Sequence, residues 1–396
     1  MSDSMPRWQR RLTGNEREYM RGLKRKDREQ VARVLAPTEA PSVPLRIRVL
    51  QSGLPTQVKL STFETLRFTC SDKLVAWAER AIELPLGCLR QPFVGRDVKL
   101  VITHAKTHLD AVITGHANAK HEVLKLVCQS ALNPLAASTY AVGLEGPPGC
   151  GKTQFVQYAL APALCRPFVS IPLGGANDLS YLLGHSYTYE GSKEGRLAAG
   201  LIASRCANPV VYFDEVDKIS RTERGAEIVN CLVHLIDPTA NHALRDRYFH
   251  DIDLDFSRCT FVFSYNDASK VDPILLDRIK RVAMAPPTRS EKQDIVLRHI
   301  IPRAQRRLGT GLTLAAEAVD ALVSESESKG ETGMRNVEKR VEHVLASAQM
   351  RSVIECEDEP PAAIGASAAR AFLHDCLLYT SPSPRDQRGS RMPSSA

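Results

Sequence analysis

The sequence predicts an α/β fold built around a parallel sheet, and three observations carry this prediction. An apolar strand over residues 140–145 runs into a glycine-rich loop and then into a helix over 153–164. A second apolar run, from Val210 to Phe213, ends in two carboxylates. Around these two units, apolar segments of strand length alternate with segments of helical spacing. This alternation is typical of a parallel sheet with helices on both faces.

The glycine-rich loop predicts a phosphate-binding site. Its pattern is G-x-x-x-x-G-K-[ST], formed here by Gly146, Pro147, Pro148, Gly149, Cys150, Gly151, Lys152 and Thr153. Glycines let the backbone turn its N–H groups toward phosphate oxygens, and the following helix presents its positive end to them. Lys152 then reaches the β- and γ-phosphates of ATP, and the Thr153 hydroxyl binds Mg²⁺. The alternative is a plain Gly/Pro-rich turn, which the preceding strand and the Lys-Thr pair disfavour.

The second strand predicts hydrolysis of the bound nucleotide. Four apolar residues precede Asp214 and Glu215, which indicates a buried central strand whose C-terminal end opens at the phosphate site. Asp214 is expected to hold Mg²⁺ through water, and Glu215 to orient and deprotonate the attacking water. Such a pair alone often marks only a strand end before a solvated turn. Its position downstream of the phosphate loop favours the catalytic interpretation.

Changes in composition and the positions of proline and glycine residues divide the chain into five expected parts. These are a charged helix with a Pro-rich linker (1–44), a helical N-terminal segment (45–113), an α/β nucleotide-binding domain (114–287), an all-helical domain (288–354), and a linker with a tail (355–396). The all-helical domain is expected to start at Thr288, which has capping-box spacing to Glu291. From residue 376 the tail has disorder-prone composition and also resembles a translated sequencing-adapter artefact.

Composition indicates a globular protein of a reducing compartment. The chain has 396 residues and 43% hydrophobic content, which suits two or three domains. No apolar run has the length of a membrane span, and the N-terminus lacks an apolar signal core, so no membrane association is expected. The ten cysteines form no C-x-x-C pair, which indicates free thiols and a cytoplasmic location. The Arg-rich start keeps mitochondrial targeting open, although Asp3, Glu16 and Glu18 argue against it.

The net charge of +7 is concentrated near the N-terminus, between Arg7 and Arg33. Such a segment can be a nucleic-acid patch or simply a solvated helix face. We favour the solvated face, because acidic residues are interleaved with the basic ones and no aromatic residues are spaced for base stacking.

From about residue 74 to residue 345 the chain resembles the ATPase module of Lon proteases, which are AAA+ proteins. It is most similar to the Lon-type ATPases of giant viruses and algae. The matching segments are 115–120, 146–153, 171–175, 184–185, 188–191, 208–218, 275–278 and 332–338. Many NTPases share the phosphate loop, whereas the Leu-Gly-Gly, Gly-His and Asp-Glu-x-Asp-Lys motifs in this order are far more specific. The resemblance implies an AAA+ P-loop NTPase fold, with a helical segment before the core and a helical lid after it.

The resemblance also implies roles for residues outside the two motifs. Asn266 matches the polar residue that helps to hold the attacking water, although an Asn after a strand is also a common turn former. Arg278 matches the arginine finger that reaches the γ-phosphate of a neighbouring subunit, and Arg335 matches the lid arginine that senses the nucleotide in its own subunit. Both arginines have the alternative of a plain surface position. A finger that acts across subunits implies a homo-oligomeric ring, by resemblance a hexamer.

Two further residues carry weaker hypotheses. Tyr189 matches the aromatic pore-loop residue that grips an unfolded polypeptide, but Glu190 stands where bacterial Lon has an aliphatic residue. Tyr189 and Tyr187 can also be ordinary strand or turn aromatics. Cys150 lies near a helix N-terminus and Lys152, a setting that favours the thiolate, so its alkylation is expected to block ATP binding. A small space-filling role for Cys150 is the favoured alternative.

Together these features predict an ATP-dependent protein unfoldase or translocase that acts on unfolded or damaged protein, as the ATPase part of a Lon-like protease. The Ser–Lys dyad of the Lon peptidase is not expected within this chain, because residues 356–396 contain no lysine. The chain is therefore expected to be either a fragment or a stand-alone unfoldase. The alternatives are an AAA+ nucleic-acid motor or clamp loader and a nucleotide-gated scaffold. Intact Lys152, Glu215, Asn266 and Arg278 disfavour the scaffold.

Overall fold

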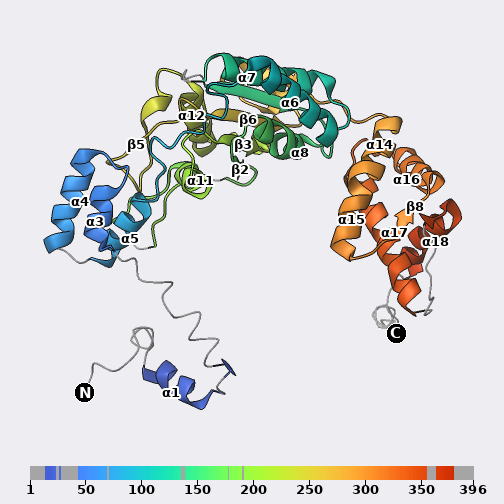
Figure 1. Ribbon diagram of the computed structural model, residues 1–396, viewed down its shortest axis with the longest axis horizontal. Helices are drawn as coiled ribbons and strands as arrows, with labels where there is room; N and C mark the ends of the chain where they lie inside the picture. The colour runs from blue at the N-terminus through green and yellow to red at the C-terminus, as the bar shows by residue number, and fades with distance from the viewer. Residues whose placement is uncertain are drawn as a thin grey trace, which may run out of the picture. The chain divides into compact units, whose positions relative to one another are not determined.

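The computed structural model describes residues 14–23, 26–27, 43–68, 71–134, 139–176, 178–189, 191–354 and 363–378. The chain forms two units, Met1–Ile82 and Glu83–Ala396 (Figure 1). Most of the predicted charged helix of residues 1–36, Glu190 beside Tyr189, and the tail beyond residue 378 lie outside the described residues. None of the described helices is both long and apolar enough to cross a membrane.

The first unit is helical. Its described helices are α1 (Gly14–Gly22), α3 (Leu45–Gln51), α4 (Thr56–Phe68) and α5 (Asp72–Ala81). Helices α3, α4 and α5 contact one another and bury Val49, Val58 and Trp77. A cation–π contact, with Arg46 over the ring of Phe63 at 3.9 Å, adds to this small core.

A five-stranded parallel sheet forms the centre of the second unit. Its strands are β1 (Tyr140–Glu145), β2 (Phe168–Pro172), β3 (Val210–Asp214), β6 (Thr260–Tyr265) and β7 (Lys280–Ala283), in the order β2-β3-β6-β1-β7. The predicted α/β fold with a parallel core is thus confirmed, and β7 is an addition to it. Because parallel strands end at the same edge of a sheet, the loops after β1, β3 and β6 meet there.

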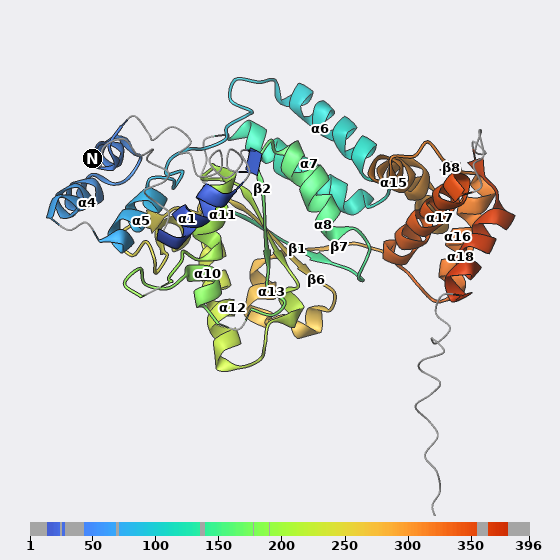
Figure 2. The same ribbon diagram turned by 90° about the horizontal axis from the view of Figure 1, so that it is seen from below.

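Helices cover both faces of the sheet (Figure 2). One face carries α6 (Val98–Val112), α7 (Ala117–Leu132) and a continuous helix formed by α8 (Lys152–Gln154), a π-helical stretch (Phe155–Leu160) and α9 (Ala161–Ala163). On the other face lie α11 (Arg196–Ser204) and α12 (Glu223–Ile236). The short helices α10 (Ser180–Leu183) and α13 (Pro273–Arg278), the 3₁₀ turns Val216–Lys218, Asn241–Ala243 and Ala268–Lys270, and the hairpin β4 (Leu244–Arg245)–β5 (Asp253–Leu254) complete this part.

The α/β unit includes helix α6 and so begins ahead of the expected boundary at residue 114. Val101, Ala105 and Leu109 recur every four residues and form one apolar stripe. This stripe is buried in the same core as Val123 of α7 and Val142 of β1.

A helical domain follows the sheet. It contains α14 (Arg289–Ile295), a π-helical stretch (Val296–Ile300), α15 (Ile301–Leu308), β8 (Thr313–Leu314), α16 (Ala316–Ser328), α17 (Arg335–Ile354), β9 (Ala363–Ile364) and α18 (Ala366–Leu378). A capping box between Thr288 and Glu291 starts α14. The domain extends beyond the expected boundary at residue 354, because Ile364 and Phe372 are buried in its core. The short parallel pair β8–β9 also departs from the expected all-helical composition.

Candidate nucleotide site

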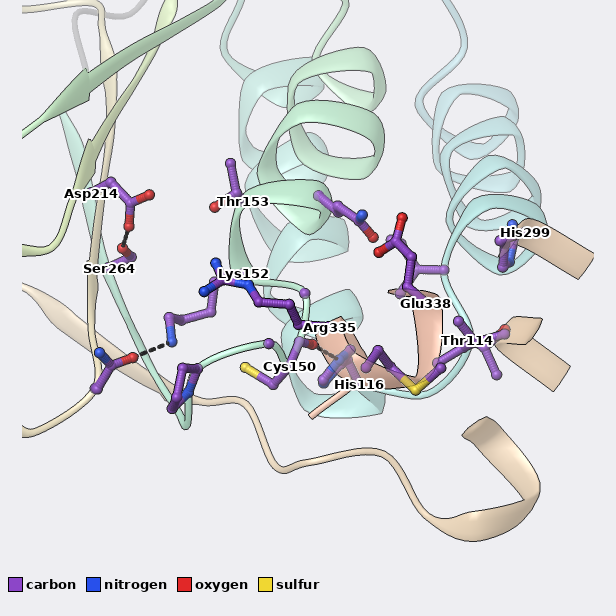
Figure 3. Close-up of a pocket in the computed structure, with 18 of the residues that line it drawn as sticks. Thr114, His116, Cys150, Lys152, Thr153, Asp214, Ser264, His299, Arg335 and Glu338 are labelled. Atoms are coloured by element: carbon purple, nitrogen blue, oxygen red, sulfur yellow. Dashed lines mark hydrogen bonds between the residues drawn. The ribbon is translucent and has the colours of Figure 1, made fainter. Parts of the chain in front are cut away.

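The C-terminal edge of the sheet and the helical domain enclose a cavity of about 420 Å³ (Figure 3). The sheet side contributes the glycine-rich loop, Asp214, Glu215 and Asn266. The helical domain, which we call the lid, contributes Arg335 and Glu338 among others. A cavity of this size lies in the range of small-molecule sites in proteins.

The glycine-rich loop has a backbone that only glycine adopts readily. Gly149 and Gly151 have φ values of 78° and 94°, in the left-handed region. At the start of the following helix, the Lys152 ammonium donates hydrogen bonds to the carbonyls of Gly146 at 2.6 Å and Pro147 at 3.1 Å, and to Oδ1 of Asn266 at 2.9 Å. A positive charge therefore lies at the mouth of the loop. This combination of charge, glycine backbone and helix start fits a phosphate group.

The carboxylate of Asp214 is held by three donors. Its Oδ1 accepts the backbone N–H of Glu215 at 3.0 Å, the hydroxyl of Tyr212 at 3.2 Å and the hydroxyl of Ser264. The Tyr212 hydroxyl also lies 3.0 Å from Oγ1 of Thr153. Thr153 of α8 and Asp214 at the end of β3 are thus joined by one phenol. Their hydroxyl and carboxylate oxygens are the kind of donors that Mg²⁺ takes beside nucleotide phosphates.

Sequence reasoning gave Tyr212 and Ser264 no role at the site. The available signal for Tyr212 was a hydroxyl in an otherwise apolar strand, two positions before Asp214. Side chains two apart in a strand lie on the same face of the sheet, so the phenol is expected on the same side as the carboxylate. Burial raises the pKa of Tyr212 well above its ordinary value, which keeps the phenol protonated as a donor.

Glu215 occupies a strained position beside the Leu-Gly-Gly segment. Its φ is 60°, a left-handed value that non-glycine residues adopt at a cost and that clusters at functional sites. One carboxylate oxygen pairs with Lys218, and this bond raises the pKa of Lys218. The other oxygen lies against Gly174, where a Cβ atom would collide with it. Gly174 therefore leaves the space that the Glu215 carboxylate occupies.

The position of Cys150 disfavours the thiolate hypothesis and suits the favoured space-filling role. The side chain is only 4% exposed, and burial raises the pKa of its thiol, with Lys152 offsetting this in part. The Cys150 carbonyl accepts a hydrogen bond from Nε2 of His116 at 3.0 Å. Burial lowers the pKa of His116, which favours the neutral ring with its proton on Nε2, because a carbonyl can only accept.

The lid contacts the glycine-rich loop directly. The backbone N–H of Met334 donates to the carbonyl of Gly149 at 3.0 Å. The preceding residue, Gly333, lies so close that a Cβ atom there would be 2.6 Å from the carbonyl oxygen of Pro148. Arg335 begins α17 immediately after this contact and lines the cavity (Figure 3).

Two residues singled out in the sequence lie outside the cavity lining. Arg278 ends α13, with its guanidinium donating to Oδ2 of Asp237 at 2.8 Å. Tyr189 lies in the loop between α10 and α11 and is 69% exposed. Its neighbour Tyr187 instead stacks on His250, with ring centroids 5.6 Å apart. Of the two tyrosines, Tyr189 is the one that is open to solvent.

A parallel sheet, a P-loop at the end of β1 and an acidic pair at the end of β3 define the class of P-loop NTPases. Residues 142–287 match AAA, the ATPase family associated with various cellular activities, so the chain carries an AAA ATPase domain. Within that class, it is similar to proteins named as Lon proteases.

Three relatives illustrate this similarity. A Lon protease homolog of Acanthamoeba polyphaga mimivirus is 35% identical over 60% of this chain and 23% of its own length. The Lon protease of Campylobacter concisus is 32% identical over 62% of this chain and 30% of its own length. The mitochondrial Lon protease homolog of Schizosaccharomyces pombe is 32% identical over 65% of this chain and 24% of its own length. The chain thus spans less than a third of each of these relatives.

Proposed function

We propose that the chain binds ATP with Mg²⁺ in the cavity at the sheet edge and hydrolyses it. The observation that carries this proposal is the convergence of Lys152, Thr153, Asp214, Glu215 and Asn266 on one cavity. Lys152 would bind the terminal phosphates, and Thr153 with Asp214 would hold Mg²⁺, which neutralises phosphate charge when bound. Glu215 would take the proton of the attacking water, and Asn266 would help to orient that water.

Nucleotide binding and turnover test this proposal separately. We expect Lys152→Ala to lose ATP binding, because the phosphate charge loses its partner. Glu215→Gln should still bind ATP but turn it over at least about 100-fold more slowly, since the general base is gone. Glu317→Gln, an exposed lid position, is the matched control. Normal turnover by Glu215→Gln would overturn the assignment of the base.

The exposed position of Arg278 supports a role in a neighbouring subunit. We propose that the chain forms a ring, by its similarity to Lon a hexamer, in which Arg278 completes the site of the adjacent copy. Mixing tests this directly: Arg278→Ala lacks the finger, and Glu215→Gln lacks the base. Sites between the two variants can pair an intact Glu215 with an intact Arg278. The mixture should therefore hydrolyse ATP faster than either variant alone. A monomeric protein with ATP, together with normal turnover by Arg278→Ala, would refute the ring.

Protein is the substrate class that we propose for the ring. The solvent-exposed ring of Tyr189 supports this, because an aromatic side chain gives broad, sequence-tolerant contact to a threaded polypeptide. Unfolded casein should then stimulate ATP turnover, and duplex or single-stranded DNA should not. Tyr189→Ala should lose this stimulation, and Tyr189→Phe should keep it. Stimulation by DNA alone would favour the alternative of a nucleic-acid motor or clamp loader.

We further propose that this ATPase serves a Lon-like ATP-dependent protease in a reducing compartment. The support is the similarity to proteins named as Lon proteases, among them mitochondrial and peroxisomal homologs. Sequencing the transcript through codon 376 and beyond tests the link. A reading frame that continues into a peptidase domain with a Ser–Lys dyad would support it, and a stop codon after the lid would favour a stand-alone unfoldase.

A further inference from the structure

Tyr212 places a hydroxyl group inside the sheet, directly behind the cavity. The side chain is fully buried on β3, and its ring packs on Phe168 with centroids 5.8 Å apart. Its hydroxyl contacts Oγ1 of Thr153 at 3.0 Å and Oδ1 of Asp214 at 3.2 Å. The cavity lining contains both of these partners but does not include Tyr212. Any effect of Tyr212 on the site therefore acts through the lining residues beside its hydroxyl, Thr153, Asp214 and Ser264.

Hydrogen-bond chemistry fixes the direction of this chain of contacts. A carboxylate oxygen can only accept, so the single phenol proton of Tyr212 points to Asp214. The phenol oxygen is then an acceptor for Thr153, and the Thr153 hydroxyl must donate its proton to Tyr212. That proton is thereby directed into the sheet. The lone pairs of Thr153 are left for a ligand on the other side of the oxygen.

We propose that Tyr212 is a positioning residue for the Mg²⁺–nucleotide complex, which fixes the Thr153 hydroxyl with its lone pairs available to the cation. This inference rests on the proposed ATP site. Outer-shell partners of this kind orient the groups that contact a metal and affect metal affinity about 10- to 100-fold.

The two partners depend on Tyr212 to different degrees. Asp214 keeps the Ser264 hydroxyl and the Glu215 N–H as donors when the phenol is removed. For the Thr153 hydroxyl, the described part of the structure gives Tyr212 as the side-chain partner. Loss of the phenol should therefore free the rotation of the Thr153 hydroxyl while Asp214 stays in place. We therefore expect a defect only in the part of nucleotide binding that depends on Mg²⁺.

Tyr212→Phe isolates the hydroxyl, because the ring and its packing on Phe168 are kept. Binding of a fluorescent ATP analogue to the purified full chain is measured across a Mg²⁺ titration and again in EDTA. We expect the variant to need about tenfold more Mg²⁺ for half-maximal enhancement of binding. Its affinity in EDTA should match that of the unmodified protein. Tyr140→Phe is the matched control, since the Tyr140 hydroxyl is also buried in this sheet but lies beside Glu122, away from the cavity lining.

Each outcome of this experiment has a defined meaning. An unmodified protein that binds no ATP analogue refutes the proposed function itself. An unmodified protein that responds to Mg²⁺, with an identical response from Tyr212→Phe, refutes the positioning role alone. Equal loss of affinity with Mg²⁺ and in EDTA also counts against it, because Tyr212 would then serve only the packing of the sheet. A shifted Mg²⁺ titration with unchanged binding in EDTA supports it.

Discussion

Gly333→Ala is the sharpest test of the contact between the lid and the glycine-rich loop. The φ of Gly333 lies outside the left-handed region, so alanine meets no backbone strain of its own. Its Cβ atom, however, would lie 2.6 Å from the carbonyl oxygen of Pro148 and 3.1 Å from Cα of Gly149. Backbone atoms on both sides cannot rotate away, so the lid segment must move.

The size of the effect follows from this overlap. Overpacking of a close contact costs about 1–3 kcal/mol. The clash lies at the surface between lid and loop, so this energy should oppose lid docking more than it opposes folding. Arg335 and Glu338 lie in the first turn of α17, which begins two residues after Gly333, so they move with it. We therefore expect ATP affinity to fall by about 5- to 150-fold, the factor that corresponds to this energy.

Binding of a fluorescent ATP analogue measures the ATP affinity, and thermal unfolding measures the stability of the fold. Gly311→Ala is the matched control in the same domain, because a Cβ atom there meets nothing within 4 Å. Unchanged affinity in Gly333→Ala would show that the nucleotide-bound lid does not use this contact. An equal loss in Gly311→Ala would show that alanine disturbs the lid for another reason.

Three further predictions concern single groups. The raised pKa of the buried Cys150 thiol lowers its thiolate fraction, so iodoacetamide at pH 8 should label the exposed Cys165 first by peptide mass mapping; equal rates would contradict the burial. Burial raises the pKa of Asp246 from 3.8 to about 6, so the folded protein binds this proton more tightly than the unfolded chain. The free energy of unfolding of the unmodified protein, measured by urea titration relative to Asp246→Asn, should therefore be greatest below pH 4 and fall by about 1–3 kcal/mol as pH rises through 6. A difference between the two proteins that does not change with pH would contradict this. Gly174→Ala should displace the Glu215 carboxylate and lower kcat at least about tenfold with ATP affinity retained, whereas a parallel loss of affinity would point to a wider disturbance.

The sequence by itself determined the α/β class and most of the sheet edge. The P-loop residues are contiguous, and the strand before them and the helix after them follow from local apolar patterning. Asp214 lies at the end of an apolar strand, and parallel strands bring such ends to one edge whatever the details of packing. For the same reason, Asn266 at the end of β6 falls beside Lys152. These residues needed no long-range information beyond the direction of the strands.

Only the tertiary structure decided the contacts that join distant segments. Burial of the Cys150 thiol disfavours its ionisation, whereas the nearby positive charge, which the sequence shows, favours it. The contact of Gly333 with Pro148 joins the lid to the loop, although the two residues are far apart in the sequence. The phenol of Tyr212 reaches Thr153 because β3 lies under the helix that follows β1. Desolvation and side-chain hydrogen bonding depend on distances through space, and a one-dimensional pattern of polarity does not contain them.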